Sequence, residues 1–357
     1  MIRLFLAARC DAEAPFVTRL AAARSDDERE SVCLSSAPGR SLWCGMHGLF
    51  ELDHPADDLA GDILLVDPSA GRAERLIRAR SLHNSLLVTE QCDQLCLMCS
   101  QPPKKTHHDR FDHFEAACRL AAPGSVIGLT GGEPTLHIEP MLAMLERLLA
   151  DRPDLAFHIL SNGQHFDAAN TARLAGALRT NIVWGIPLYA ADSALHDRIV
   201  GKPSAFERLA ESFAHLLTAG ARIELRTVLL HDNLGTLGDL ARFVALHLSH
   251  IEQWSLMGLE NIGFARRRWD DLYINLRTEF TPVAAALDQA SLRGIPARLF
   301  NIPLCHIPPA FRRFAVASIS DWKQRFAPAC GTCTARSDCA GFFEWHPDHL
   351  VEEVAPL

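Results

Sequence analysis

Short β-rich apolar runs alternate with amphipathic stretches of helical period from Leu86 to about Glu260. This alternation is typical of parallel strands joined by crossover helices, because consecutive parallel strands need a long return connection. Six strands are predicted: Ser85–Thr89, Ser125–Thr130, Ala156–Ser161, Ile182–Pro187, Arg222–Leu230 and Gln253–Leu259. The pattern predicts an α/β fold, a partial (β/α)6 TIM-like barrel open on one side, with reactive groups on the loops at the carboxyl ends of the strands.

The segments on either side of this region have a different character. Residues 1–84 contain short apolar runs and a predicted hairpin in which Asp62–Val66 returns through a turn into Ala73–Ile77. After about Asp270 the chain has frequent prolines, few long periodic runs and its last four cysteines. The sequence therefore predicts a small, mostly-β accessory unit at 1–84, the partial barrel at 85–269 and a cysteine-rich extension at 270–357.

The composition argues against several classes of function. Lys and Arg number 35 against 43 Asp and Glu, a formal net charge of −8, so the overall charge does not favour nucleic acid or anionic lipid. The first apolar segment is interrupted by Arg3 and Arg9, and no run of 18 apolar residues occurs. We therefore expect a cytoplasmic protein with no nucleic-acid partner and no membrane partner.

Three cysteines follow the first predicted strand with the spacing C-x3-C-x2-C, at Cys92, Cys96 and Cys99. Clustered cysteines in a reducing compartment usually indicate a metal rather than disulfides. Three thiolates on one short loop can hold three irons of a cubane cluster and leave the fourth iron without a protein ligand. The spacing alone is also compatible with structural zinc.

Glycines and polar residues lie where the second and third predicted strands end. The second strand leads into Gly131, Gly132 and Glu133, where the glycines let the backbone approach a ligand closely and the carboxylate suits an ammonium group. An isolated pair of glycines fits a tight turn equally well. The third strand leads into Ser161 and Asn162, which offer a hydroxyl and an amide at the same rim.

The fifth predicted strand carries Arg226 within an otherwise apolar run. A guanidinium in that position needs a partner. One interpretation is a ligand carboxylate held by the guanidinium fork, and the other is an internal ion pair with a residue such as Glu224. The sequence leaves both open.

A second group of cysteines lies near the C-terminus. Cys330, Cys333 and Cys339 have C-x2-C-x5-C spacing, and Cys305 stands 25 residues before the first of them. Four thiolates could hold structural zinc or a second iron–sulfur cluster. Cysteine counting does not separate the two.

Together these motifs resemble the radical S-adenosylmethionine (SAM) superfamily over roughly Leu86–Glu260. The resemblance implies that Cys92, Cys96 and Cys99 hold a [4Fe-4S] cluster whose free iron binds the amine and carboxylate of SAM. The superfamily often carries an auxiliary [4Fe-4S] cluster after its barrel, so the resemblance favours a second cluster over zinc at the C-terminal cysteines.

The same resemblance implies which residues contact SAM. Gly131, Gly132 and Glu133 would meet the methionine amine, Ser161 and Asn162 the ribose or carboxylate, and Met98 would lie near the adenine. Two positions depart from the superfamily pattern. Met98 stands where an aromatic residue commonly precedes the third cysteine. Pro187 stands where many relatives have serine, and without that hydroxyl Arg226 would make more of the contact with the carboxylate of SAM.

The chemistry implied is electron transfer from a reduced cluster into SAM. That transfer releases methionine and a 5′-deoxyadenosyl radical, which abstracts hydrogen from a substrate. An electron donor protein is a further expected partner.

Some stretches are more particular than the superfamily and resemble the C-type radical SAM maturases of the His-Xaa-Ser system (HxsC). These stretches are Asn84–Glu90, Leu97–Lys104, Gly258–Ala265 and Ser318–Lys323. The resemblance implies a ribosomally made peptide substrate and a partner radical SAM enzyme. Two alternatives are a radical SAM enzyme acting on a small molecule, of the cofactor-biosynthesis cyclase type, and a non-enzymatic iron–sulfur or zinc redox protein.

Overall fold

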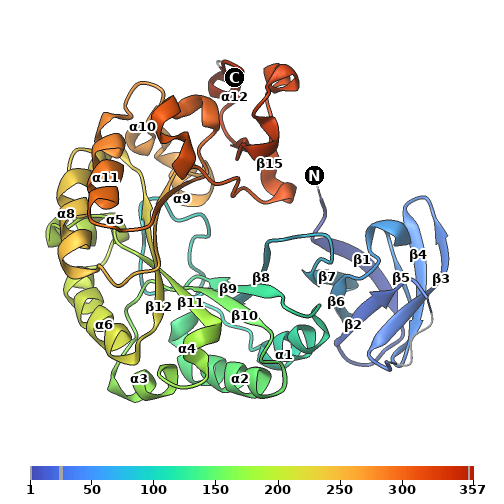
Figure 1. The fold of residues 1–357 in the computed structure, drawn as a ribbon. Helices are drawn as coiled ribbons and strands as arrows, with labels where there is room; N and C mark the ends of the chain where they lie inside the picture. The colour runs from blue at the N-terminus through green and yellow to red at the C-terminus, as the bar shows by residue number, and fades with distance from the viewer. Residues whose placement is uncertain (1, 24–26, 353) are drawn as a thin grey trace. The chain divides into compact units, whose positions relative to one another are not determined.

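The structure is a computed structural model that describes residues 2–23, 27–352 and 354–357. The chain forms two compact units (Figure 1). The first unit comprises Met1–Val88, His108–Thr130 and His137–His158, and the second comprises Thr89–His107, Gly131–Leu136 and Ile159–Leu357. Among the helices of the described residues, none is both long and apolar enough to cross a membrane. The three-part division at residues 84 and 269 stays a prediction.

The N-terminal strands of the first unit form a closed barrel in the order β1-β5-β4-β3-β2-β6-β7. The strands are β1 (Phe5–Cys10), β2 (Phe16–Ala21), β3 (Glu30–Ala37), β4 (Arg40–Gly45), β5 (Gly48–Leu52), β6 (Ile63–Asp67) and β7 (Arg72–Ile77). Side chains alternate in burial along the strands, so that Phe16, Thr18 and Leu20 of β2 are buried. The predicted hairpin is confirmed, because β6 and β7 pair antiparallel with Val66 opposite Ala73. The mostly-β N-terminal unit is confirmed as well.

Two helices of the first unit, α1 (Phe111–Leu120) and α2 (Ile138–Asp151), pack against each other. The sequence predicts α2 from its apolar stripe, and the structure buries every residue of that stripe: Met141, Leu142, Met144, Leu145, Leu148 and Leu149. The stripe recurs every three to four residues, so one face of the helix meets the core.

The central element of the α/β region is a seven-stranded sheet in the order β14-β13-β12-β11-β10-β9-β8. Its strands are β8 (Asn84–Thr89), β9 (Val126–Gly131), β10 (Ala156–Leu160), β11 (Ile182–Pro187), β12 (Arg222–Val228), β13 (Gln253–Met257) and β14 (Ala297–Phe300). The pairs from β11 to β14 are parallel. All six predicted strands are present. Three of them, β10, β12 and β13, end one or two residues earlier than predicted, because the last predicted residues already belong to the loops.

The prediction of six strands is wrong by one, since β14 is a seventh. It pairs in parallel with β13, with Leu256 opposite Leu299. β14 is only four residues long and follows Pro296, so neither length nor periodicity distinguishes it in the sequence. The helix before it, α11 (Thr281–Leu292), is rich in alanine and begins with Pro282 in its first turn, a position that tolerates proline. The sheet therefore continues into the segment predicted to be an extension.

Helices accompany the strands of the second unit (Figure 1). They are α3 (Ala168–Leu174), α4 (Leu178–Asn181), α5 (Ser193–Val200), α6 (Ala205–Ala219), α7 (His231–Leu234), α8 (Leu237–His247), α9 (Gly263–Arg267), α10 (Trp269–Leu272), α11 and α12 (Asp348–Glu352). Helix α6 ends at Gly220, which takes the left-handed conformation that terminates the helix. Near the C-terminus β15 (Gln324–Arg325) and β16 (Phe342–Phe343) form a small antiparallel sheet.

A buried ion pair connects segments of the N-terminal barrel. Asp62 Oδ2 accepts a hydrogen bond from Arg75 Nε at 2.6 Å, and Asp62 Oδ1 accepts one from Ala79 N at 2.8 Å. The two charged residues are 2% and 9% exposed. A charge at this depth must keep its partner, since an unpaired buried charge is strongly destabilising.

We expect Asp62→Ala to lower the free energy of unfolding by about 3–5 kcal/mol, because it leaves the buried guanidinium of Arg75 unpaired. The matched control is Arg40→Ala, which breaks the more exposed pair with Glu51 and should cost less than about 1 kcal/mol. Urea unfolding followed by circular dichroism measures both. Equal losses in the two variants would contradict the role assigned to burial.

Candidate functional site

The loop that carries the first three cysteines, Gln91–Ser100, is here called the cysteine loop. Its backbone is bonded to the end of helix α5. Leu95 N and Leu97 N donate hydrogen bonds to the carbonyls of Val200 and Ile199, at 3.0 Å and 2.8 Å. The last carbonyls of a helix have no partner within the helix, so the cysteine loop satisfies them and is held in place by them.

Three glycines let other segments approach the cysteine loop closely. A Cβ atom at Gly201 would lie 2.6 Å from Leu95 O, one at Gly263 would lie 2.6 Å from Ser100 O, and one at Gly132 would overlap the backbone of the loop. Gly201 and Gly263 also have positive φ angles of 65° and 60°, which side chains rarely adopt. Backbone therefore packs against backbone at three points of the loop.

The three thiols of the loop are partly buried and resist ionisation. Burial raises the pKa of Cys92 to about 11 and also raises the pKa of Cys96 and of Cys99, and the neighbouring thiols add to the effect at Cys96. Cys96 Sγ donates to Gln94 Oε1 at 3.6 Å, and Cys99 Sγ donates to Gln101 O at 3.1 Å. Thiolates here require a positive centre to compensate them, as a bound metal would do.

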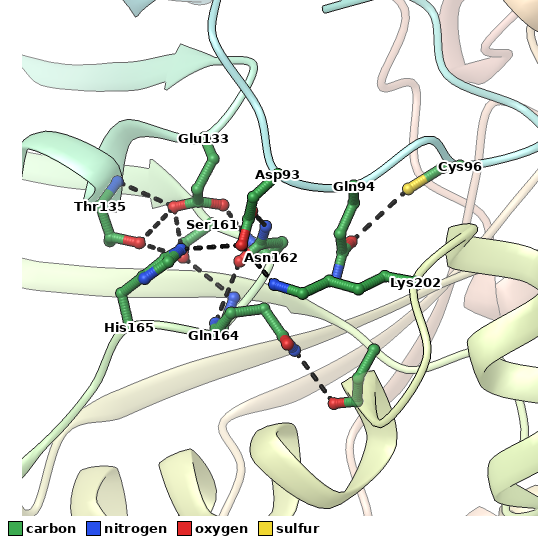
Figure 2. A network of polar contacts seen from close by, with 12 residues as sticks. Asp93, Gln94, Cys96, Glu133, Thr135, Ser161, Asn162, Gln164, His165 and Lys202 are labelled. Atoms are coloured by element: carbon green, nitrogen blue, oxygen red, sulfur yellow. Dashed lines mark hydrogen bonds and ion pairs between the residues drawn. The ribbon is translucent and has the colours of Figure 1, made fainter.

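Glu133 is fully buried, and its carboxylate accepts hydrogen bonds from two loops (Figure 2). Oε1 accepts from Thr135 N at 2.8 Å, from the Thr135 hydroxyl and from Ser161 Oγ at 2.9 Å, while Oε2 accepts from Asn162 N. Burial raises the pKa of Glu133, and these donors oppose that rise. The carboxylate therefore orders the loops that follow β9 and β10, and its contact with an ammonium group stays a prediction.

Asp93 connects the cysteine loop to these polar contacts (Figure 2). Its Oδ1 accepts a hydrogen bond from Asn162 Nδ2 at 2.7 Å, Lys202 Nζ pairs with its Oδ2, and His165 Nε2 lies 3.2 Å from the same oxygen. Burial opposes the ionisation of Asp93, but its contacts with His165, Lys202 and Asn162 hold the pKa well below its usual range. Asp93 is thus a carboxylate that joins three segments of the chain.

Two predicted residues have partners outside these polar contacts. Met98 is 8% exposed and belongs to an apolar cluster with Cys96, Tyr189 and Leu259. Arg226 Nη1 donates to both carboxylate oxygens of Glu224, at 3.1 Å and 3.0 Å. Of the two interpretations of Arg226, the internal ion pair is the one the structure contains.

The structure adds residues that the sequence does not indicate. Asp93 directly follows Cys92, and Thr135 lies two residues after Glu133. Their closeness to predicted site residues in the sequence could have identified them. His165 and Lys202 are distant in sequence from the cysteines and match no motif. Only the fold brings them to Asp93.

The donors of the cysteine loop fit an iron–sulfur cluster. Among the described residues no group of three or more His, Cys, Asp or Glu side chains surrounds a single metal position. A cluster does not require such a group, because each thiolate binds a different iron and the sulfurs need not converge. Gln94 is 2% exposed, and its Nε2 finds no hydrogen-bond partner in the part of the chain that the structure describes, so it offers a donor to a bound acceptor. The role of the three cysteines as ligands stays a prediction.

The four C-terminal cysteines line one pocket of about 370 Å³, here called the cysteine pocket: Cys305, Cys330, Cys333 and Cys339. Cys339 Sγ accepts from Leu304 N and Gly341 N, both at 3.4 Å, and Cys333 Sγ accepts from Leu357 N at 3.5 Å. Burial raises the pKa of Cys305 to about 11, with Cys339 and Cys330 contributing. Backbone N–H groups directed at sulfur stabilise thiolates and tune iron–sulfur sites. Among the described residues these sulfurs do not surround a single metal position, so the donors suit a cluster, in which each thiolate binds a different iron.

Comparison with known families gives one match. Residues 86–244 match the family model of the radical SAM superfamily. The matched segment begins in β8 and ends in α8, and it includes the first three cysteines, the Gly-Gly-Glu segment, Ser161, Asn162 and Arg226. It excludes the C-terminal cysteines. No curated protein matches the chain.

Solved structures resemble part of this chain at low sequence identity. Streptococcus suis SuiB bound to S-adenosylmethionine has a TM-score of 0.51 and 16% identity, over 62% of this chain and 51% of SuiB. The chain thus spans about half the length of SuiB. Another similar structure is Streptococcus suis SuiB bound to precursor peptide SuiA, with a TM-score of 0.49 and 16% identity over 63% of this chain and 49% of SuiB. A third is a radical SAM methyltransferase from Sphaerobacter thermophilus, with a TM-score of 0.45 and 15% identity over 80% of this chain and 77% of that protein. The family match covers less than half of the chain, and the similarity to SuiB, at 16% identity, shows the fold alone.

We expect Gly201→Ala to displace the cysteine loop, because the new Cβ would meet Leu95 O and the φ of 65° disfavours a side chain. The free energy of unfolding should fall by about 1 kcal/mol or more, and iron retained after anaerobic reconstitution should fall with it. Gly238→Ala in α8 is the control, since no atom lies within 4 Å of its Cβ position. Iron analysis and circular dichroism measure both effects, and parental iron content in Gly201→Ala would contradict the expectation.

Proposed function

We propose that this chain is a radical SAM enzyme whose [4Fe-4S] cluster is held by Cys92, Cys96 and Cys99. The observation that carries the proposal is the grouping of three thiols on a loop bonded through Asp93 to Asn162, beside the buried Glu133. The family match over residues 86–244 and the fold shared with SAM-bound SuiB support it. As part of the proposal, the seven strands form a partial TIM-like barrel with the cysteine loop at its rim.

When bound, the cluster and SAM would supply a one-electron cleavage of a carbon–sulfur bond, yielding methionine and a 5′-deoxyadenosyl radical that takes hydrogen from substrate. The electron comes from a low-potential donor protein. Glu133 and Asp93 order the loops on which SAM would rest, and Gly131, Gly132, Ser161 and Asn162 are the proposed SAM contacts. Met98, Tyr189 and Leu259 form an apolar wall beside Cys96 that would exclude water from a reactive radical.

The cysteine pocket is proposed to hold a second [4Fe-4S] cluster. Four thiols lining one pocket, with N–H groups directed at two of the sulfurs, support a fully protein-ligated centre. Structural zinc is the competing occupant, because it accepts the same four ligands.

The proposed substrate is a ribosomally made peptide of the His-Xaa-Ser type, and a second radical SAM enzyme is a proposed partner. Both rest on the sequence stretches that resemble the His-Xaa-Ser maturases. A cytoplasmic location belongs to the same proposal, since a reducing compartment keeps the clustered thiols reduced. A small-molecule substrate is the alternative within the superfamily, and a non-enzymatic redox protein is the alternative outside it.

Cleavage of SAM tests the proposed activity. Anaerobically reconstituted and reduced protein should convert SAM to 5′-deoxyadenosine, measured by liquid chromatography. Cys96→Ala should reduce the product to the level without enzyme, because the cluster loses one of its three ligands. Cys33→Ala, a half-buried cysteine of the N-terminal barrel, should retain the parental rate. An intact cluster that yields no product, with or without the candidate peptide, would favour the redox protein.

Metal content tests the second site independently of activity. Two [4Fe-4S] clusters predict about eight iron atoms per chain, and Cys330→Ala combined with Cys333→Ala should leave about four. The thiols of the cysteine loop are unchanged in this variant, so their cluster acts as the internal control. One zinc and about four iron atoms in the parental protein would contradict a second cluster.

A further inference from the structure

A second pocket adjoins the cysteine pocket within the same unit. It is here called the histidine pocket, because His306 and His346 line it together with apolar side chains that include Leu259, Ile302 and Phe342. A mostly apolar lining with a few polar groups is typical of sites that receive small organic groups.

Both histidines are more than nine-tenths buried, at 7% and 8% exposure. Neither Nε2 atom has a hydrogen-bond partner among the described residues. Each ring contacts Phe342, with ring centroids 5.6 Å and 5.3 Å from its own. Buried polar nitrogens are normally satisfied, so these two nitrogens can bind a polar group that enters the pocket.

The histidine pocket lies where substrates bind in related α/β architectures. Gly258 and Leu259 follow β13, Asn301 and Ile302 follow β14, and Leu229 follows β12. These are the carboxyl ends of three parallel strands, the edge at which open sheets and barrels hold their ligands.

The wall of the histidine pocket is shared with the cysteine pocket. Pro303 and Phe342 line both, and the consecutive residues Cys305 and His306 line one pocket each. A group bound between the two histidines would therefore lie next to the C-terminal thiols.

We propose that the histidine pocket receives an uncharged side chain of the substrate, apolar along its length and ending in a hydroxyl or N–H group. The identification of the bound group as part of the substrate rests on the proposed function. A hydroxyl can both donate and accept a hydrogen bond, so it can pair with an imidazole Nε2 atom in either tautomer of the ring.

A charged ligand or a metal ion would fit the histidine pocket less well. None of the described residues that line it is Asp, Glu, Lys or Arg, so a charged guest would be desolvated without a counter-ion. Burial lowers the pKa of His346 to about 4, which keeps that ring neutral. A metal ion would need more ligands than the two imidazoles, and no group of three His, Cys, Asp or Glu side chains is arranged for one in the described part of the chain.

The test uses p-cresol as the probe, with toluene and 4-methylbenzoate as matched molecules that lack the hydroxyl or carry a charge. Dissociation constants for the full-length reconstituted protein are measured by ligand-observed NMR. We expect p-cresol to bind about three- to tenfold more tightly than toluene, as one hydrogen bond would provide, and 4-methylbenzoate to bind most weakly. No SAM turnover is needed, so this result stands or falls separately from the proposed activity.

Variants assign the binding to the two histidines. His306→Phe and His346→Phe should each weaken p-cresol about three- to tenfold and leave toluene within about twofold, while His346→Gln, which keeps a hydrogen-bonding group, should retain most of the affinity. His250→Phe is the control, because its Nε2 is also unpartnered in the described residues but does not line the pocket. Equal affinity for p-cresol and toluene, or loss of p-cresol binding in His250→Phe, would overturn the proposal.

Discussion

The buried carboxylate of Glu133 is the constraint on which the candidate site depends. A carboxylate removed from water must receive hydrogen bonds from the protein, and here they come from Thr135, Ser161 and Asn162. Meeting that requirement fixes two strand-end loops relative to each other. Asn162 in turn donates to Asp93 of the cysteine loop, so the hydrogen bonds around Glu133 extend to the loop that carries the thiols.

The cysteine loop has little regular structure of its own and is positioned by backbone contacts. Helix α5 accepts two of its N–H groups, and Gly201 and Gly263 approach its carbonyls too closely for a side chain. Backbone contacts of this kind do not use the thiols of the loop. Three thiols and the amide nitrogen of Gln94 therefore remain available to a bound group, which is what a cofactor site requires.

The two C-terminal pockets share walls but differ in chemistry. Four thiols lie among apolar side chains and Arg336 in the cysteine pocket, whereas the histidine pocket has no thiol and no charged side chain in its described lining. Cys305 and His306 are adjacent in sequence and line different pockets, so a backbone shift at one of them would also move the other pocket's wall. This arrangement is suited to holding an organic group beside a metal centre.

The sequence by itself determined the first six strands of the sheet and the barrel hairpin, and it predicted candidate reactive residues, because periodicity and close cysteine spacing are local properties of a chain. It did not reveal β14, whose four residues carry no distinctive period. It also left the partner of Arg226 open and gave no sign that His165 and Lys202 meet Asp93. Tertiary structure alone decided these contacts, because burial and pairing of charges depend on which distant segments the fold brings together.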